Sequence, residues 1–299
     1  MSDQTDNEEK TSEFGHGTTG HSWDGIEEWN NPLPRWWVWC FYLTIIWGVL
    51  YTIAYPAWPL INSATSGLLG YSTRANVAED MAAVVMRNQG LNDKLDAIEL
   101  VDLPTDTALH DYAVKWGTAV FANNCSQCHG RGAAGVQASG YPNLLDDAWL
   151  WGGAIDDIAY TVTHGIRNEQ SPDARWSEMP AFGEILTDEE VAQVVAHVRQ
   201  ISDQEHDAAL ATAGATLFAE NCASCHGDDG AGMRDLGAPN LTDAIWLYGG
   251  SEETLTETVS NSRFGVMPAW GEEYRVGSGL SEAEVKAVSA YVHQLGGGE

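Results

Sequence analysis

The sequence is short of positive charge and rich in negative charge. Its 299 residues include 14 Lys and Arg against 43 Asp and Glu, which gives a formal net charge of −29. The phosphates of a nucleic acid would repel such a chain, so the composition argues against nucleic-acid binding. Two explanations of the acidity stay open. It favours a basic protein partner reached by electrostatic steering, and it is equally typical of a salt-adapted proteome.

Cysteine is also scarce, and its placement argues against a disulfide framework. Of the five cysteines, four lie in two copies of a Cys-x-x-Cys-His motif, and the fifth, Cys40, lies in an apolar run as a small packing residue. The two copies are Cys125-Ser-Gln-Cys128-His129 and Cys222-Ala-Ser-Cys225-His226. Thiols at this spacing attach a haem through thioether bonds, and the adjacent imidazole ligates its iron. The sequence therefore predicts two covalently attached haem c groups with two proximal histidine ligands.

Charge of either sign is missing between Trp36 and Thr73. Within this stretch residues 36–55 form an apolar run with aromatic side chains at both ends, and Pro56 and Pro59 follow it. At the helical rise, about 20 residues span the hydrocarbon thickness of a bilayer. We expect residues 32–59 to form one transmembrane anchor. The alternatives are a buried soluble helix and a cleaved signal peptide, but the long acidic segment in front disfavours the signal peptide.

The segments on either side of the anchor are polar. Residues 1–31 lack periodicity and predict a mostly disordered cytoplasmic tail. His16 and His21 lie in this tail, where scattered histidines seldom bind a metal. Residues 60–105 are interpreted as a connector that is helical over residues 74–100. Since haem c is attached outside the cytoplasm, we expect a cytoplasmic N-terminus and haem domains on the outer side of the membrane.

A repeat follows the connector. Residues 106–203 and 207–296 align, and we expect each to form one domain. Eight residues recur 97 positions later: Gly117, Phe121, Asn124, Pro142, Asn143, Trp149, Gly152 and Gly153 match Gly214, Phe218, Asn221, Pro239, Asn240, Trp246, Gly249 and Gly250. A Met-Pro-Ala-aromatic-Gly segment recurs only 88 positions later, so residues 168–175 are predicted to be an inserted loop.

Each repeat ends in a predicted helix with an explicit start. Thr187-Asp-Glu-Glu190 and Ser281-Glu-Ala-Glu284 both match the capping-box pattern, and valines follow at helical spacing. Each repeat is thus predicted to hold about three helices and long loops. A unit of this size has a thin core, and a buried haem would supply apolar surface.

The sixth iron ligand is predicted to be a methionine in each repeat. Met179 and Met267 both begin the Met-Pro-Ala segment just before the last helix, and thioether sulfur favours the reduced iron. The alternative is ligation by two histidines, with His164 as the rival ligand. Met233 and His197 are interpreted as packing residues. If sulfur and imidazole close both irons, no position is open for substrate, which favours electron transfer over catalysis.

Other residues are candidates for supporting the haem. A ligating histidine usually donates its second ring N–H to a carbonyl, and the carbonyls of Pro142 and Pro239 are our candidates. Haem propionates need donors when they are partly buried. The candidates for propionate binding are Arg167, Arg263, Trp149 and Trp246, and the alternative for both tryptophans is core packing.

The stretch before and after the anchor carries a resemblance to a known family. The residues are His21-Ser-Trp-Asp-Gly-Ile-Glu-Glu-Trp-Asn-Asn-Pro-Leu-Pro-Arg-Trp-Trp37 and Tyr55-Pro-Ala-Trp-Pro59, followed by the two haem motifs. This combination resembles the CcoP (FixP) subunit family of cbb3-type cytochrome c oxidases. The resemblance implies a mainly α fold, with one N-terminal transmembrane helix followed by two tandem class I cytochrome c-like domains. It also implies His129, Met179, His226 and Met267 as the iron ligands.

The resemblance further implies a role inside a complex. A dihaem subunit of this family takes electrons from a soluble cytochrome c donor and passes them through a monohaem cytochrome c subunit to the haem–copper catalytic subunit. That subunit reduces oxygen and pumps protons, so the complex is the enzyme and the dihaem subunit is a non-catalytic carrier. Two rivals stay open, namely a free-standing anchored dihaem shuttle and a dihaem enzyme such as a peroxidase or thiosulfate-oxidising cytochrome. The repeated methionine argues against the enzyme.

Overall fold

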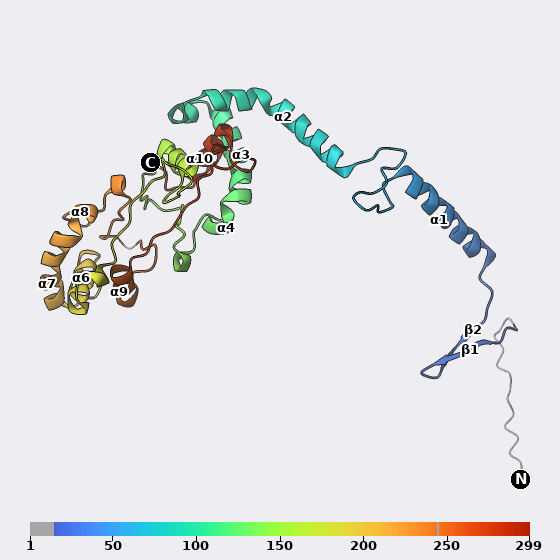
Figure 1. The fold of residues 1–299 in the computed structure, drawn as a ribbon, viewed down its shortest axis with the longest axis horizontal. Coiled ribbons are helices and arrows are strands. Elements are labelled where there is room, and N and C mark those ends of the chain that lie inside the picture. The colour runs from blue at the N-terminus through green and yellow to red at the C-terminus, as the bar shows by residue number, and fades with distance from the viewer. Residues whose placement is uncertain (1–14, 244) are drawn as a thin grey trace, which may run out of the picture. The chain divides into compact units, whose positions relative to one another are not determined.

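The computed structural model describes residues 15–243 and 245–299, which form helices and one β-hairpin (Figure 1). The contacts between residues divide the chain into two units, Met1–Met86 and Arg87–Glu299. The first contains the hairpin, the apolar helix and most of the connector. The second contains both haem motifs.

The hairpin corrects the expectation of disorder in the N-terminal tail. Strands β1 (Thr18–Trp23) and β2 (Ile26–Trp29) pair antiparallel, with Trp23 opposite Ile26. The two residues between them, Asp24 and Gly25, have φ angles of 51° and 81°. These are the angles of a type I′ turn, whose twist matches that of paired strands and which Asp-Gly favours. The prediction was wrong for residues 18–29 because the polar composition hid this local turn signal.

Helix α1 (Arg35–Ala54) covers the predicted anchor. It is the one described helix that is long and apolar enough to cross a membrane, with a mean hydropathy of 1.6 over its most apolar window. None of its described side chains is buried. It begins after Pro34 and ends before Pro56. Proline has no backbone N–H to donate, so Pro56 cannot extend the helix. The helix therefore has the length and surface of a single-pass anchor.

The connector is helical from Thr73 to Ala97, which agrees with most of the predicted helix over residues 74–100. Helix α2 (Thr73–Ala97) leads into the short 3₁₀ helix η1 (Leu100–Thr105). Leu95, Leu100 and Leu103 are buried in a cluster with residues of the haem-bearing part. The ammonium group of Lys286 donates hydrogen bonds of 2.7 and 3.0 Å to the carbonyls of Asp96 and Ile98. The end of the connector is thus fixed to the C-terminal helix of the chain.

The haem-bearing part contains the same four helices twice. They are α3 (Thr107–Asn124), α4 (Ser126–His129), α5 (Ile155–His164) and α6 (Asp188–Ile201), followed by α7 (Ala208–Asn221), α8 (Ala223–His226), α9 (Glu252–Asn261) and α10 (Glu282–His293). Three 3₁₀ turns join them: η2 (Gln137–Ser139), η3 (Phe182–Glu184) and η4 (Arg234–Leu236). Both predicted capping boxes are present, at the starts of α6 and α10.

The last helices of the two repeats are exchanged. Helix α10 of the second repeat packs on α3 and α5, whereas α6 of the first repeat packs on α7 and α9 (Figure 1). We call α3–α5 with α10 the first half, and α7–α9 with α6 the second half. The bounds 106–203 and 207–296 stay a prediction for the sequence repeat. Each packed half is built from both stretches.

Two glycines allow these helix pairs to approach closely. A Cβ atom on Gly117 of α3 would overlap the carbonyl oxygen of Ala287 on α10. A Cβ atom on Gly214 of α7 would in the same way overlap the carbonyl oxygen of Gln193 on α6. A larger residue at either glycine would force the two helix backbones apart, so each glycine ties a helix of one repeat to a helix of the other.

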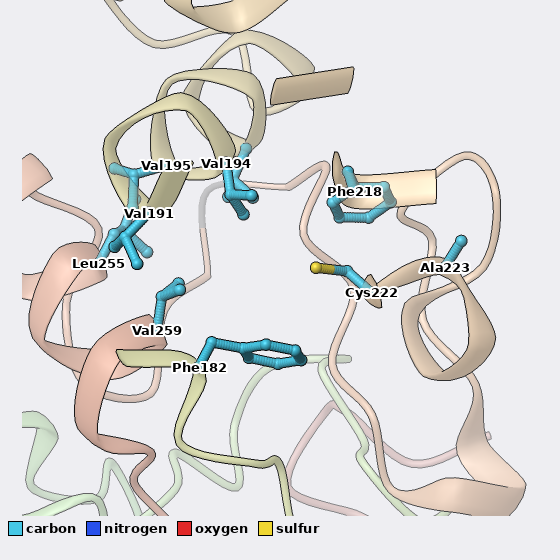
Figure 2. Packing of buried hydrophobic residues seen from close by; sticks show 10 residues of the cluster. Phe182, Val191, Val194, Val195, Phe218, Cys222, Ala223, Leu255 and Val259 are labelled. Atoms are coloured by element: carbon cyan, nitrogen blue, oxygen red, sulfur yellow. The ribbon is translucent and has the colours of Figure 1, made fainter. Parts of the chain in front are cut away.

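Each half has its own apolar cluster. In the second half Phe182, Val191, Val194, Val195 and Val198 of the first repeat pack with Phe218, Cys222, Leu255 and Val259 of the second. Figure 2 shows the sulfur of Cys222 directed toward the side chains of α6 and α9. In the first half Val120, Phe121, Ile158 and Val162 pack with Leu280, Val285, Val288 and Val292. The exchange therefore involves the cores and not only the surfaces.

Substituting Gly117 tests the close contact between α3 and α10. We expect Gly117→Ala to lower the free energy of unfolding by about 1–3 kcal/mol, because the added methyl group overpacks a tight contact. Gly90→Ala is the matched control. Gly90 lies inside α2 with no atom near its missing Cβ, so this change should leave stability unchanged or raise it by up to about 1 kcal/mol. Denaturant unfolding of the full-length protein in detergent measures both; equal effects would contradict the packing.

Candidate haem centres

Each Cys-x-x-Cys-His motif begins where a long helix ends. The Cys125 amide donates to the Phe121 carbonyl at 2.9 Å, and the His129 amide donates to the Cys125 carbonyl at 3.0 Å. The second motif repeats both bonds, from Cys222 to Phe218 at 2.8 Å and from His226 to Cys222 at 3.0 Å. The first cysteine of each motif is therefore the N-cap of a one-turn helix, α4 or α8, which carries the second cysteine and the histidine.

The imidazoles lie against the proline carbonyls that the sequence analysis selected. The Nδ1 atom of His129 lies 3.3 Å from the Pro142 carbonyl oxygen, and that of His226 lies 3.0 Å from the Pro239 carbonyl oxygen. Burial lowers the pKa of both histidines, and the bond to the proline carbonyl opposes this to a lesser degree. The neutral form is thereby favoured, with Nδ1–H as donor and Nε2 left to bind a metal.

None of the four motif cysteines forms a disulfide bond. Cys128 and Cys225 are exposed, whereas Cys222 is buried and Cys125 is half-buried. Burial, reinforced by the neighbouring motif cysteine, raises the pKa of Cys125 and of Cys222 to about 11. Each motif therefore presents one cysteine to the core and one to the surface.

The two candidate methionines lie in the opposite halves from those that the sequence order suggests. Met267 packs in the first half, in the cluster that contains Cys125 and Phe121. Met179 packs in the second half, in the cluster of Cys222 and Phe218. Sequence analysis assigned each methionine to the domain of the motif that precedes it. In the structure Met267 shares an apolar cluster with Cys125, and Met179 shares one with Cys222.

The loops that precede α6 and α10 carry the two methionines, and hydrogen bonds join these loops to each other. Ile166 and Met267 exchange backbone hydrogen bonds of 2.9 and 3.0 Å. Arg167 donates to the carbonyls of Gly265 at 2.7 Å and Ser177 at 2.6 Å. The hydroxyl of Ser262 donates to the Met179 carbonyl at 2.6 Å. The backbones of both methionine loops are therefore fixed by residues of the other repeat.

The donor set of each half fits a haem c. Each half offers two thiols, an imidazole oriented by a carbonyl and a thioether in the same apolar cluster. These groups suit a covalently attached, six-coordinate iron porphyrin. The other candidate ligands are less suitable. His164 bonds to the Tyr274 hydroxyl at 3.0 Å, the His197 ring packs at a tilt of 57° against the Phe218 ring, and Met233 is 40% exposed.

The residues predicted to bind the haem propionates differ in their hydrogen-bond and packing partners. Trp149 donates its indole N–H to the Gly297 carbonyl, so this N–H already has an acceptor. Trp246 packs against the second-half cluster. Arg263 bonds to two threonines of α9 and lies 4.8 Å from the ring centroid of Tyr248. Propionate binding stays a prediction for Arg167, Arg263 and Trp246.

Sequence reasoning missed three residues between the halves: Trp151, Arg175 and Tyr248. Trp151 and Tyr248 occupy equivalent positions in Trp-Leu-Trp-Gly-Gly and Trp-Leu-Tyr-Gly-Gly, so the repeat alignment contained the signal. Arg175 lies in the insertion, which has no counterpart in the second repeat and therefore gave no signal.

Comparison with known proteins gives matches along most of the chain. The model of the N-terminal domain of cytochrome oxidase-cbb3, FixP, matches residues 15–62. The models of subunit III of cbb3-type cytochrome c oxidase and of cytochrome c match residues 113–198 and 211–296. The CcoP subunit of Cereibacter sphaeroides is 58% identical over 94% of this chain and 95% of its own length. The FixP subunit of Bradyrhizobium diazoefficiens is 48% identical over 99% of this chain and 100% of its own length.

Replacing Trp149 tests the hydrogen bond from its indole N–H to the Gly297 carbonyl. We expect Trp149→Phe to lower the free energy of unfolding by about 1 kcal/mol more than Trp246→Phe, because only the former leaves a backbone carbonyl without its donor. The two changes remove the same ring volume at equivalent positions of the repeat. Thermal unfolding, with limited proteolysis of residues 294–299, measures the stability of both variants. Equal stability of the two would contradict the hydrogen bond to Gly297.

Proposed function

Because the chain belongs to the CcoP (FixP) family of cbb3-type cytochrome c oxidase subunits, we propose that it receives electrons from a soluble cytochrome c donor and passes them on without reducing oxygen itself. It is a dihaem electron-transfer subunit with two covalently bound haem c groups. The proposed onward route leads to a monohaem cytochrome c subunit and then to the haem–copper catalytic subunit.

The first haem is proposed to be attached at Cys125 and Cys128 and closed by His129 and Met267. The second is attached at Cys222 and Cys225 and closed by His226 and Met179. The observation that carries this proposal is that each methionine shares an apolar cluster with a cysteine of the opposite repeat. Two protein ligands on each iron leave no position for oxygen or another substrate.

The protein residues hold each group and keep water away from it. A bound haem c supplies a one-electron carrier, whose potential rises with thioether ligation. The carbonyls of Pro142 and Pro239 orient the imidazoles, and buried valines and phenylalanines line the two clusters. A rigid, dry site changes little when an electron arrives, which suits a relay.

The proposed location is the bacterial inner membrane, with the N-terminus in the cytoplasm and both haems in the periplasm. Helix α1 supports a single crossing by its length and apolar surface. Orientation rests on the chemistry of the haem motifs, because haem c is attached outside the cytoplasm. The remaining subunits of the oxidase would surround α1 in the membrane.

The proposed pairing of each histidine with the methionine of the other repeat can be tested with one haem at a time. In a protein that lacks the second haem (Cys222→Ser with Cys225→Ser), we expect Met267→His to lower the midpoint potential of the remaining haem, since imidazole favours oxidised iron more than thioether does. Met179→His in the same background should leave that potential unchanged. Redox titration followed by absorbance measures both, and the opposite result would show that each methionine serves its own repeat.

Electrostatic steering predicts a salt-dependent donor reaction. With a net charge of −29, the second-order rate of reduction by a basic cytochrome c should fall roughly tenfold or more between low and physiological ionic strength. Reduction by a small neutral reductant should not change, which separates docking from the chemistry of the haems. Stopped-flow absorbance measures both rates, and a donor rate independent of salt would contradict a basic partner.

A further inference from the structure

Two buried N–H donors at the boundary of the halves have no acceptor among the described residues. Trp151 is 8% exposed, and its indole Nε1 has no hydrogen-bond partner there. The Arg175 side chain is 16% exposed, and its Nε also has none. Leaving a buried donor unpaired is unfavourable, and more so when the group is charged. A pair of such donors indicates that an acceptor outside the chain completes them.

The two donors are neighbours, and the charged one is held firmly. The guanidinium carbon of Arg175 lies 5.5 Å from the ring centroid of Trp151 and 4.9 Å from that of Tyr160. One terminal nitrogen forms an ion pair of 3.0 Å with Asp157, in the first turn of α5. The aromatic rings and this ion pair fix the guanidinium plane, so Nε–H keeps one direction.

Both residues belong to the surroundings of the first haem. Ile166 forms backbone bridges to Arg175 and to Met267, which places Arg175 one strand away from the proposed iron ligand. Trp151 lies four residues before α5, whose Ile158 and Val162 share a cluster with Met267 and Cys125. The Trp151 ring rests on Gly237 of the second half, where a Cβ atom would overlap it.

The arrangement recurs once in the other half. Tyr248, the counterpart of Trp151, rests on Gly140, which is the counterpart of Gly237. The guanidinium of Arg263 lies over the Tyr248 ring at 4.8 Å. An aromatic side chain with a guanidinium over its face thus occurs once for each haem motif. A cation beside a neutral donor selects an anion.

We propose that Trp151 and Arg175 bind one propionate of the haem attached at Cys125 and Cys128, with the indole Nε1–H and the guanidinium Nε–H donating to its carboxylate. This inference rests on the haem attachment in the proposed function. The carboxylate satisfies both orphan donors, and the nearby positive charge of Arg175 favours the reduced haem. The insertion at residues 168–175, which only the first repeat has, supplies this charge.

Resonance Raman spectroscopy of the full-length protein in detergent tests the contact directly, because the propionate bending mode reports hydrogen bonding to that group. We expect Trp151→Phe and Arg175→Gln each to shift this mode. Arg175→Gln should also lower the midpoint potential of the haem whose potential falls in Met267→His. Trp149→Phe is the matched control: its indole N–H bonds to Gly297, so the propionate mode should not move.

The result that overturns the inference is an unchanged propionate mode in both variants while both haems stay attached. A shift confined to the haem of the second motif would overturn the assignment to the first haem. If Trp151→Phe fails to fold, Arg175→Lys decides, since it keeps the charge but lacks the Nε–H in that place, and it should still shift the mode. Absence of covalent haem from the unsubstituted protein would instead contradict the proposed function.

Discussion

The contact of helix backbones at Gly117 and Gly214 determines which helices of the two repeats pack together. Each glycine removes a side chain from a helix–helix contact, so α3 meets α10 and α7 meets α6 at backbone distance. The methionine segment lies just before the final helix in both repeats. Exchanging that helix therefore carries the methionine to the other half. The proposed composition of the two haem sites therefore follows from helix packing more than from the order of motifs in the chain.

The exchange also bears on how the two haems work together. Neither stretch of about 90 residues contains a complete core, because each cluster takes valines from one repeat and the cysteine motif from the other. Separate motion of two sequential domains would pull both clusters apart. A relay needs a fixed separation between its carriers, and an intertwined unit provides this without a large interface. The connector joins the unit through Leu95, Leu100 and Leu103, which pack in the first half.

Much of the local structure could be predicted from the sequence, because the signals were local. The motif spacing, the capping boxes at Thr187 and Ser281, the apolar run of α1 and the carbonyls of Pro142 and Pro239 all depend on neighbours in the chain. The exchange could not be predicted in this way. The apolar faces of α6 and α10 are alike, and periodicity shows which face is buried but not which of two similar partners it meets. Trp149 was named as a candidate donor to a propionate because composition cannot show that the Gly297 carbonyl accepts its N–H. The hairpin was missed because its turn signal, Asp24-Gly25, lies in a polar segment.

Locating the two irons tests the central claim most directly. A crystal structure of the haem-loaded protein, with anomalous diffraction recorded at the iron edge, would place each iron without reference to the chain. The account predicts one iron between His129 and Met267 and the other between His226 and Met179. An iron bound by His129 and Met179 would contradict it, as would an iron with an open coordination position.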